Sequence, residues 1–587
     1  MTKRPKVVDF AGSLRALLED ALAAYPQDRL WFRRDSKRLS QGYEYRGTQF
    51  LTGVLPALGD ALLRGLDDGR LPDTSGLPFG THFSKGIHVP RIFSSLWLRV
   101  FTRRGLLRED ADPTAVAFLM SILFIGKKLL LECSHRNLLE AYNEYISIDS
   151  QLPPEPEPWA EVDGDLSRDR LGSLTDYQVD CNRDLLSSNS STTGEAGRLR
   201  AILATVQQSA DKLASELGLF VPDQMVGKHG PGAVSGHPEG KYKNNFPEWP
   251  DRLEALFPFD EHGVLNASLI PEMGIAELPG LDEPCSVLLH VPKTRNTPRL
   301  IAKEPVAHQW CQQAVANQLR KRVMRKTLGR SIDFFDQTPS QLACEQASRT
   351  GLQATLDLSS ASDRLSCALV QRVFRANISL LRLLVGTRTR FCQFGPTAPF
   401  RQLLRLRKFA SMGSALTFPV QSVVFAVICI GVGKFLHPER SLRSLSREVR
   451  VYGDDLIVPV EWVSDLVRTL SALGLKVNES KSFAKGNFRE SCGQYSFRGY
   501  DVTPVRIRKP SATDAESVRS YAAYSNNAFV KGFWRLATWI DRTVLRDLNI
   551  PVLDRRLPPM GLVSNSRGFP ADQKFSWDRN LHMWTIR

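Results

Sequence analysis

Two adjacent carboxylates, Asp454 and Asp455, follow Gly453 between two short runs of apolar, mostly β-branched residues. Such runs on either side of a glycine predict a β-hairpin with the carboxylates projecting from its turn. Adjacent carboxylates repel each other, and they stay ionised near neutral pH chiefly when a divalent cation lies beside them. The hairpin is therefore predicted to hold a metal ion.

A third carboxylate, Asp357, ends a predicted strand upstream, in the stretch 353–363. Asp357, Asp454 and Asp455 offer the hard oxygen ligands that suit two Mg²⁺ ions, for which Mn²⁺ is expected to substitute. Two such ions clamp the attacking and leaving oxygens of a phosphoryl displacement. Taken singly, the Asp454-Asp455 pair is explained at least as well by an ordinary polar turn, and Asp357 by a helix cap. Their joint presence, with the motifs below, favours the metal site.

The composition points to a nucleic-acid partner. The 587-residue chain carries 77 Lys and Arg against 62 Asp and Glu, a formal charge of +15, and such a surplus favours polyanions. Nine dispersed cysteines indicate neither a disulfide framework nor a zinc site, which fits a reducing cytoplasm. The apolar runs 115–126 and 423–432 are too short to span a membrane, so we expect buried helices there and no membrane partner.

Residues 1–150 show apolar residues at helical spacing, and the polar stretches 153–158 and 187–193 predict surface loops. A basic segment with two prolines runs from Val291 to Arg299. Arg offers phosphate a bidentate fork and Lys a point charge, so this segment is suited to a triphosphate, with a solvated basic loop as the alternative. A helix of about five turns is predicted after it.

A loop of small residues, 410–419, is predicted to open an apolar helix that ends near Leu436. Such a loop allows close approach to a sugar, and Ser411 or Thr417 is suited to bond a ribose 2′-hydroxyl; an ordinary helix cap is the alternative. Farther along, Lys481 follows a predicted helix (461–473) and strand (475–477). It is a candidate to protonate a leaving pyrophosphate, although an exposed loop lysine is the commoner explanation.

With these motifs, residues 291–504 resemble RNA-dependent RNA polymerases, specifically the catalytic replicase subunits of the single-stranded RNA bacteriophages, the leviviruses such as Qβ. The resemblance rests on the basic segment, taken here as 291–305, and on Asp-Leu-Ser-Ser-Ala-Ser-Asp at 357–363. It rests further on Ser-Met-Gly at 411–413 with Thr-Phe at 417–418, and on Tyr-Gly-Asp-Asp at 452–455. Two further stretches are the most particular to the phage group: Phe-Arg-Glu-Ser-Cys-Gly at 488–493 and Asp-Val-Thr-Pro at 501–504.

The resemblance implies an α+β fold, a right-hand polymerase with an antiparallel palm sheet and helix-rich fingers. Four regions are expected: a helical N-terminal region contributing to the fingers (1–197), fingers with the basic nucleotide-binding segment (198–350), a palm with inserted finger elements (351–499), and a thumb and C-terminal region (500–587).

The resemblance also assigns the site. Metal ligands are Asp357, Asp454 and Asp455, and these act in catalysis together with Lys481. Nucleotide-binding residues are Lys293, Arg295, Arg299, Asp363, Ser411, Gly413 and Thr417. Asn296 stands where a Qβ-like segment carries lysine, and Ser414 where its loop carries asparagine.

The implied function is replication of a single-stranded RNA phage genome from ribonucleoside triphosphates in the cytoplasm of an infected bacterium. Expected partners are the RNA template, host elongation factors Tu and Ts, and a ribosomal RNA-binding protein. Within catalysis, a narnavirus-type replicator polymerase is the runner-up, and a reverse transcriptase is disfavoured by Asp363 and the Ser-Met-Gly loop. A basic, non-enzymatic RNA-binding structural protein is the alternative from another class, and it would bind RNA without Mg²⁺-dependent synthesis.

Overall fold

The structure is a computed structural model. It describes residues 8–546 except 160–163, 168–169, 178–193, 237–242, 245, 247 and 264–282, together with 550, 561–562, 575–578 and 583–586. The predicted loop at 187–193 lies outside the described residues. The chain divides into two compact units. The first consists of Met1–Cys133, Pro292–Asn296 and Tyr500–Arg587, and the second of Ser134–Val291 and Thr297–Gly499.

The first unit is mainly helical, as predicted for the N-terminal residues. Its helices are α1 Phe10–Ala24, α2 Arg29–Arg46, α3 Leu55–Asp68, α4 Ser94–Val100, α5 Pro113–Phe124, α18 Ala515–Val530 and α19 Trp534–Thr543. Its short strands are β1 His82–Ser84, β2 Ile87–Pro90, β13 Tyr500–Asp501, β14 Phe575–Asp578 and β15 Met583–Ile586. Segments far apart in sequence meet here, since α1 packs against α19 and Asp20 accepts hydrogen bonds from the first amides of α19. A carboxylate at a helix N-terminus is favourable because of the helix dipole.

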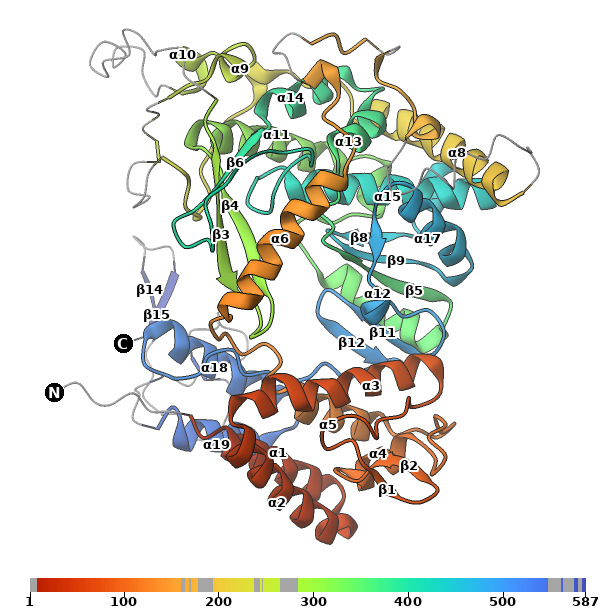
Figure 1. The fold of residues 1–587 in the computed structure, drawn as a ribbon, viewed down its shortest axis with the longest axis vertical. Coiled ribbons are helices and arrows are strands. Elements are labelled where there is room, and N and C mark those ends of the chain that lie inside the picture. The colour runs from red at the N-terminus through yellow and green to blue at the C-terminus, as the bar shows by residue number, and fades with distance from the viewer. Residues whose placement is uncertain are drawn as a thin grey trace, which may run out of the picture. The chain divides into compact units, whose positions relative to one another are not determined.

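An antiparallel sheet forms the centre of the second unit (Figure 1). Its strands, in spatial order, are β10 Lys476–Val477, β5 Gln353–Ser359, β9 Asp455–Pro459 and β8 Arg450–Tyr452. The predicted hairpin is therefore confirmed as β8–β9. The strand that carries Asp357 is confirmed as well, although it continues two residues beyond that carboxylate.

One face of this sheet is buried in the main core. Leu356, Leu358, Leu456 and Val458 alternate along β5 and β9 and join the core cluster, since side chains two apart share a face of a strand. The helices whose residues belong to the same cluster include α8 Glu195–Glu216, α13 Cys367–Phe374, α14 Ile378–Thr387, α15 Thr417–Leu436 and α17 Val463–Ala472. By length and composition alone α15 passes as a membrane span, yet 83% of its apolar window is buried inside the protein.

The opposite face of the sheet is covered by α12 Thr338–Thr350 and by the hairpin β11 Phe488–Ser491 and β12 Gln494–Phe497. Arg489 anchors this hairpin. Its guanidinium is fully buried and donates to the carbonyl oxygens of Gln353 (2.5 Å), Gly486 (2.6 Å) and Phe488 (2.7 Å). The anchoring fixes the hairpin beside the first residue of β5.

A second sheet has the order β4 Pro298–Lys303, β3 Ser286–Pro292, β6 Phe391–Phe394 and β7 Leu403–Arg405. Helix α6 His135–Gln151 packs on it through Tyr142 and Tyr145, which share a cluster with Leu288 and Phe394. The predicted helix after the basic segment is confirmed as α11 Val306–Met324. Both units therefore combine helices with sheet, which confirms the mixed α+β class.

We expect Arg489→Lys to destabilise the second unit by about 3 kcal/mol or more, because lysine cannot satisfy the buried carbonyl groups that the guanidinium fork reaches. Chemical denaturation should show a lower midpoint than for the parent chain. The control is Arg401→Lys, the same change at an exposed position, which should leave the midpoint unchanged. Equal midpoints for the two variants would refute the anchoring role of Arg489.

Candidate active site

The β8–β9 turn presents the two adjacent carboxylates. Tyr452 pairs with Asp455, so Gly453 and Asp454 form a two-residue connection. Gly453 has a φ of +65°, and an added Cβ would lie 3.2 Å from the Phe418 ring. Its N–H donates to Ser422 Oγ of α15 at 3.1 Å. Glycine is therefore needed here, and the turn is tied to the core helix while Asp454 remains exposed.

Asp357 and Asp455 are direct cross-strand partners on β5 and β9. Their neighbours Leu356 and Leu456 point into the core, so both carboxylates lie on the opposite face. Like charges directly opposite in an antiparallel pair are destabilising. The sheet register therefore brings together two groups that repel each other unless a proton or a cation intervenes.

The pKa of Asp455 is raised by this crowding. Burial, followed by the charges of Asp454, Glu490 and Asp357, raises its pKa to about 7. The opposing influence is the N–H of Cys492, which donates to Asp455 Oδ2 at 3.0 Å. Cys492 and Gly493 both have positive φ, +49° and +75°, as a type I′ turn between β11 and β12 requires.

Asp357 is held by residues that follow β10. Asn478 Nδ2 donates to Asp357 Oδ2 at 2.8 Å, and Ser482 Oγ accepts from the Asp357 N–H at 3.2 Å. Lys481 Nζ lies 3.5 Å from the same Asp357 oxygen, on the short 3-10 turn Glu479–Lys481. Burial lowers the pKa of Lys481, but the surrounding carboxylates, Asp357 first and Glu490 next, outweigh it and raise that pKa above its ordinary value.

The donor set fits Mg²⁺ in chemistry. Asp357, Asp454 and Asp455 supply hard carboxylate oxygens, and the raised pKa of Asp455 marks a site where added positive charge is favourable. Among the described residues, no three His, Cys, Asp or Glu side chains are already gathered as a ligand set. Metal binding by these three residues stays a prediction.

The small-residue loop lies against β4. The Ala302 N–H donates to the Met412 carbonyl at 2.7 Å, and a Cβ on Gly413 would lie 1.9 Å from the Ala302 oxygen. The predicted loop and the helix that it opens are confirmed, and Thr417, at the first position of α15, donates to the Ser411 carbonyl at 2.7 Å. Gly413 and Thr417 thus shape the loop, while their contact with a nucleotide stays a prediction.

The predicted ribose-facing residues are both bonded to buried neighbours. Asp363 Oδ1 accepts from Lys408 Nζ at 3.0 Å, and Ser411 Oγ lies 2.5 Å from the Tyr145 hydroxyl. Asp363 keeps 25% of its side chain exposed, whereas Ser411 is buried. Their contact with a ribose also stays a prediction.

The basic segment forms the connection between β3 and β4. Arg299 is exposed on β4, the strand that bonds to the Ser411–Gly413 loop. Lys293 and Arg295 belong to the first unit, in which Arg295 Nη1 donates to Thr48 Oγ1 at 3.4 Å. Lys293 and Arg295 thus belong to a different unit from the carboxylates, and their phosphate contacts stay predictions.

Sequence reasoning missed several residues of the site. Glu490 contributes a fourth negative charge near Asp455 and Lys481. It belongs to the Phe-Arg-Glu-Ser-Cys-Gly stretch, whose polar residues could have indicated a site residue there. Lys408 and Tyr145 carry no such signal. Gln312 of α11 accepts a hydrogen bond from Ser414 Oγ at 2.9 Å and donates one to the buried Glu304. Neither residue was indicated by the sequence.

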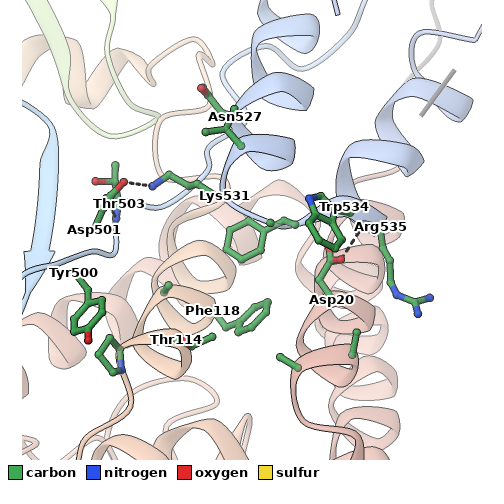
Figure 2. A pocket seen from close by; sticks show the side chains of 17 residues that line it. Asp20, Thr114, Phe118, Tyr500, Asp501, Thr503, Asn527, Lys531, Trp534 and Arg535 are labelled. Carbon is green, nitrogen blue, oxygen red and sulfur yellow. Dashed lines mark hydrogen bonds and ion pairs between the residues drawn. The ribbon is translucent and has the colours of Figure 1, made fainter. Parts of the chain in front are cut away.

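A separate cavity of about 730 Å³ lies in the first unit and includes none of the predicted site residues (Figure 2). Tyr500 and Trp534 line it and are largely exposed, and Lys531 Nζ pairs with Asp501 Oδ2 at 2.6 Å. Asp501 belongs to the Asp-Val-Thr-Pro stretch, so that stretch borders this cavity.

Comparison with known proteins shows what part of the chain resembles. Residues 283–535 match the family model described as RNA replicase, beta-chain. The RNA-directed RNA polymerase subunit beta of Qbeta virus (strain MX1) is 29% identical over 392 residues, 64% of this chain and 62% of that protein. The subunit of Escherichia virus Qbeta is 33% identical over 51% of this chain and 46% of that protein. The beta chain of Enterobacteria phage fr is 34% identical over 38% of this chain and 37% of that protein.

The matched part of the chain spans between 37% and 62% of the length of these three relatives. A solved structure titled "RdRp complex" is similar with a TM-score of 0.38 and 9% identity, over 59% of this chain and 33% of that one. The family-model match covers the carboxylates, the small-residue loop and both hairpins of the site. Over residues 283–535 the chain is therefore similar to RNA replicase beta chains.

We expect the raised pKa of Asp455 to make stability fall with rising pH when no divalent cation is present. The unfolded chain releases this proton near the ordinary value of 3.8 and the folded chain near 7, so between them the folded state binds the extra proton. The contribution is complete below the lower value and lost above the upper one, with a slope of up to about 1.4 kcal/mol per pH unit.

The measurement is the free energy of unfolding between about pH 4 and 8 in a chelator, for the parent and Asp455→Asn. The variant should show a shallower decline over this range. Buried acids outside this site contribute equally to both proteins, so the difference reports on Asp455 and on the carboxylates coupled to it. Parallel curves would show that Asp455 is not the late-titrating group.

We expect Gly413→Ala to destabilise the second unit by about 2 kcal/mol or more, because the new Cβ collides with the Ala302 carbonyl and the residue has a φ of +131°. Gly232→Ala is the control, since its added Cβ meets nothing within 4 Å. Thermal unfolding should separate the two variants clearly. A Gly413→Ala protein as stable as Gly232→Ala would contradict the close approach.

Proposed function

We propose that this chain is an RNA-directed RNA polymerase that extends a strand by transferring nucleotides from ribonucleoside triphosphates. The observation that carries the proposal is the pairing of Asp357 with Asp455 beside the exposed Asp454 and Lys481. The match of residues 283–535 to the RNA replicase beta-chain family model supports the same activity. In this proposal the β10-β5-β9-β8 sheet belongs to the palm of a right-hand polymerase (351–499, with inserted finger elements). Residues 198–350 form the fingers, to which the N-terminal helical region (1–197) contributes, and residues 500–587 form the thumb and C-terminal region.

Asp357, Asp454 and Asp455 would hold two Mg²⁺ ions through their carboxylate oxygens. Bound Mg²⁺ supplies charge stabilisation to a phosphoryl transfer and lowers the pKa of the attacking hydroxyl. The chain's own contribution is to hold the carboxylates in place. The Cys492 amide fixes Asp455, and Asn478 fixes Asp357, so both keep their positions while charge changes around them.

Lys481 would donate a proton to the pyrophosphate that leaves. Its raised pKa keeps the ammonium protonated at neutral pH, and its side chain is about half exposed, at 49%. Its ammonium group can therefore contact a phosphate, while Asp357 Oδ2, 3.5 Å from Lys481 Nζ, orients it. A positioned acid of this kind contributes roughly 10²–10⁴-fold to a reaction rate.

The nucleotide would be bound by two groups of residues. Lys293, Arg295 and Arg299 would pair with its phosphates, as their charge and the constrained backbone suggest. Asp363 and Ser411 would face the ribose, with Gly413 and Thr417 shaping the loop that carries Ser411. A partly exposed carboxylate and a hydroxyl are suited to a 2′-hydroxyl, which both donates and accepts hydrogen bonds.

The template would be the single-stranded RNA genome of a bacteriophage, copied in the cytoplasm of an infected bacterium. The chain's formal charge of +15 supports an RNA partner. The relatives are named as beta subunits, which supports action within a complex. Host elongation factors Tu and Ts and a ribosomal RNA-binding protein are the partners that we propose for it.

Asp454→Asn tests the proposal. It should slow RNA synthesis by roughly 10³-fold or more, because a metal ligand that stabilises the transition state by several kcal/mol is lost. RNA affinity should stay nearly unchanged. The assay is incorporation of labelled ribonucleotides on a single-stranded RNA template with Mg²⁺, in the presence and absence of bacterial lysate.

The matched control is Asp260→Asn, which makes the same change of charge at an exposed position of α10 Phe259–His262. It should synthesise RNA at the parent rate. RNA synthesis by Asp454→Asn at the parent rate would contradict the assignment of polymerase activity to this site. Salt-sensitive RNA binding by the parent with no product under either condition would support a structural RNA-binding protein instead.

A further inference from the structure

Two buried side chains of the second unit, Lys408 and Tyr145, connect the residues that we place at the ribose. Lys408 precedes the small-residue loop, and Tyr145 lies on α6. Lys408 Nζ contacts Asp363, and the Tyr145 hydroxyl contacts Ser411. Lys408 Nζ also lies 3.4 Å from the centre of the Tyr145 ring. The four side chains thus form one continuous network from Asp363 to Ser411.

The Lys408 ammonium has no exposed surface, so it requires compensation by negative charge. Asp363 Oδ1 provides it at 3.0 Å, and Asp149 Oδ1 lies farther away, at 3.9 Å. The Asp149 carboxylate is engaged elsewhere, since it accepts the backbone N–H groups of Arg407 and Lys408. Asp363 is therefore the carboxylate that the ammonium holds most directly.

Tyr145 restrains both ends of the network. Its ring face attracts the ammonium by a cation–π interaction, which limits where Lys408 Nζ can move. Its hydroxyl lies 2.5 Å from Ser411 Oγ, a short contact between two buried groups. One aromatic side chain on α6 thus fixes the Ser411 hydroxyl and the cation that orients Asp363.

We propose that Lys408 and Tyr145 are positioning residues that set the preference of this site for ribonucleotides over 2′-deoxyribonucleotides. The inference rests on the proposed function, because it concerns how Asp363 and Ser411 are held. A site discriminates strongly against a missing hydroxyl only if its polar groups stay unpaired when that hydroxyl is absent. A carboxylate fixed by a buried ammonium cannot turn away to find another partner, so the deoxyribonucleotide is penalised.

Lys408→Met tests the first half of the network. Methionine keeps an apolar chain of similar length and removes the charge. We expect the ratio of kcat/KM for ATP to that for dATP, on one RNA template, to fall about 10-fold or more. The fall should come mainly from a higher kcat/KM for dATP, because the released Asp363 can adapt to the missing hydroxyl.

Tyr145→Phe tests the second half and keeps the experiment informative if Lys408→Met does not fold. It removes one hydroxyl and leaves the ring beside the ammonium, so the ratio should fall by less than for Lys408→Met. The double variant should lose less discrimination than the product of the single losses, because both changes act on one network.

Lys434→Met is the matched control. Lys434 Nζ donates to the carbonyl oxygens of Pro438 (2.5 Å) and Arg440 (2.7 Å) at the end of α15. Its replacement also removes an ammonium and its hydrogen bonds within the second unit. It should lower stability while leaving the ATP to dATP ratio at the parent value.

The outcomes separate this inference from the proposed function. RNA synthesis by the parent with an unchanged ratio in Lys408→Met and in Tyr145→Phe would overturn the inference alone. A parent that makes no RNA but binds ATP in preference to dATP in an equilibrium titration would contradict the polymerase assignment alone. The inference would then stand only if Lys408→Met removed that binding preference. A parent with neither synthesis nor preference would overturn both.

Discussion

Repulsion among carboxylates on one face of a sheet is the constraint on which the rest of the second unit depends. The register of β5 and β9 places Asp357 opposite Asp455, while Asp454 and Glu490 add charge nearby. This arrangement is unfavourable in itself, so the surrounding structure must enforce it. The apolar face of the same two strands provides that enforcement, because a one-residue slip of register would turn Leu356 and Leu456 out of the core.

The polar surroundings complete the enforcement. The fully buried Arg489 holds the β11–β12 hairpin against the start of β5, and the turn of that hairpin delivers the Cys492 amide to Asp455. On the other side, Asn478 and Lys481 hold Asp357. Rigid elements therefore support each carboxylate separately. Such preorganisation suits a group that must keep its position while charge develops next to it.

The sequence allowed much of this to be predicted, for local reasons. Gly453 between apolar runs indicated the hairpin, and the small residues at 411–414 indicated the loop before α15, because turn chemistry and periodicity act over a few residues. The network of Lys408 and Tyr145 was not predictable in this way. Tyr145 and Ser411 are 266 positions apart, and neither a buried lysine nor a tyrosine at helical spacing signals its partner in advance. The role of Arg489 was hidden likewise, since its partners are backbone carbonyls.

The most direct test of the account is whether the crowded carboxylates bind a divalent cation. Mn²⁺ binding to the parent and to Asp357→Asn can be titrated by electron paramagnetic resonance, with Asp260→Asn as the control for charge. The account predicts saturable binding to the parent and the control, and an affinity at least about 10-fold weaker in Asp357→Asn. Equal Mn²⁺ binding by all three proteins, or none by the parent, would contradict it.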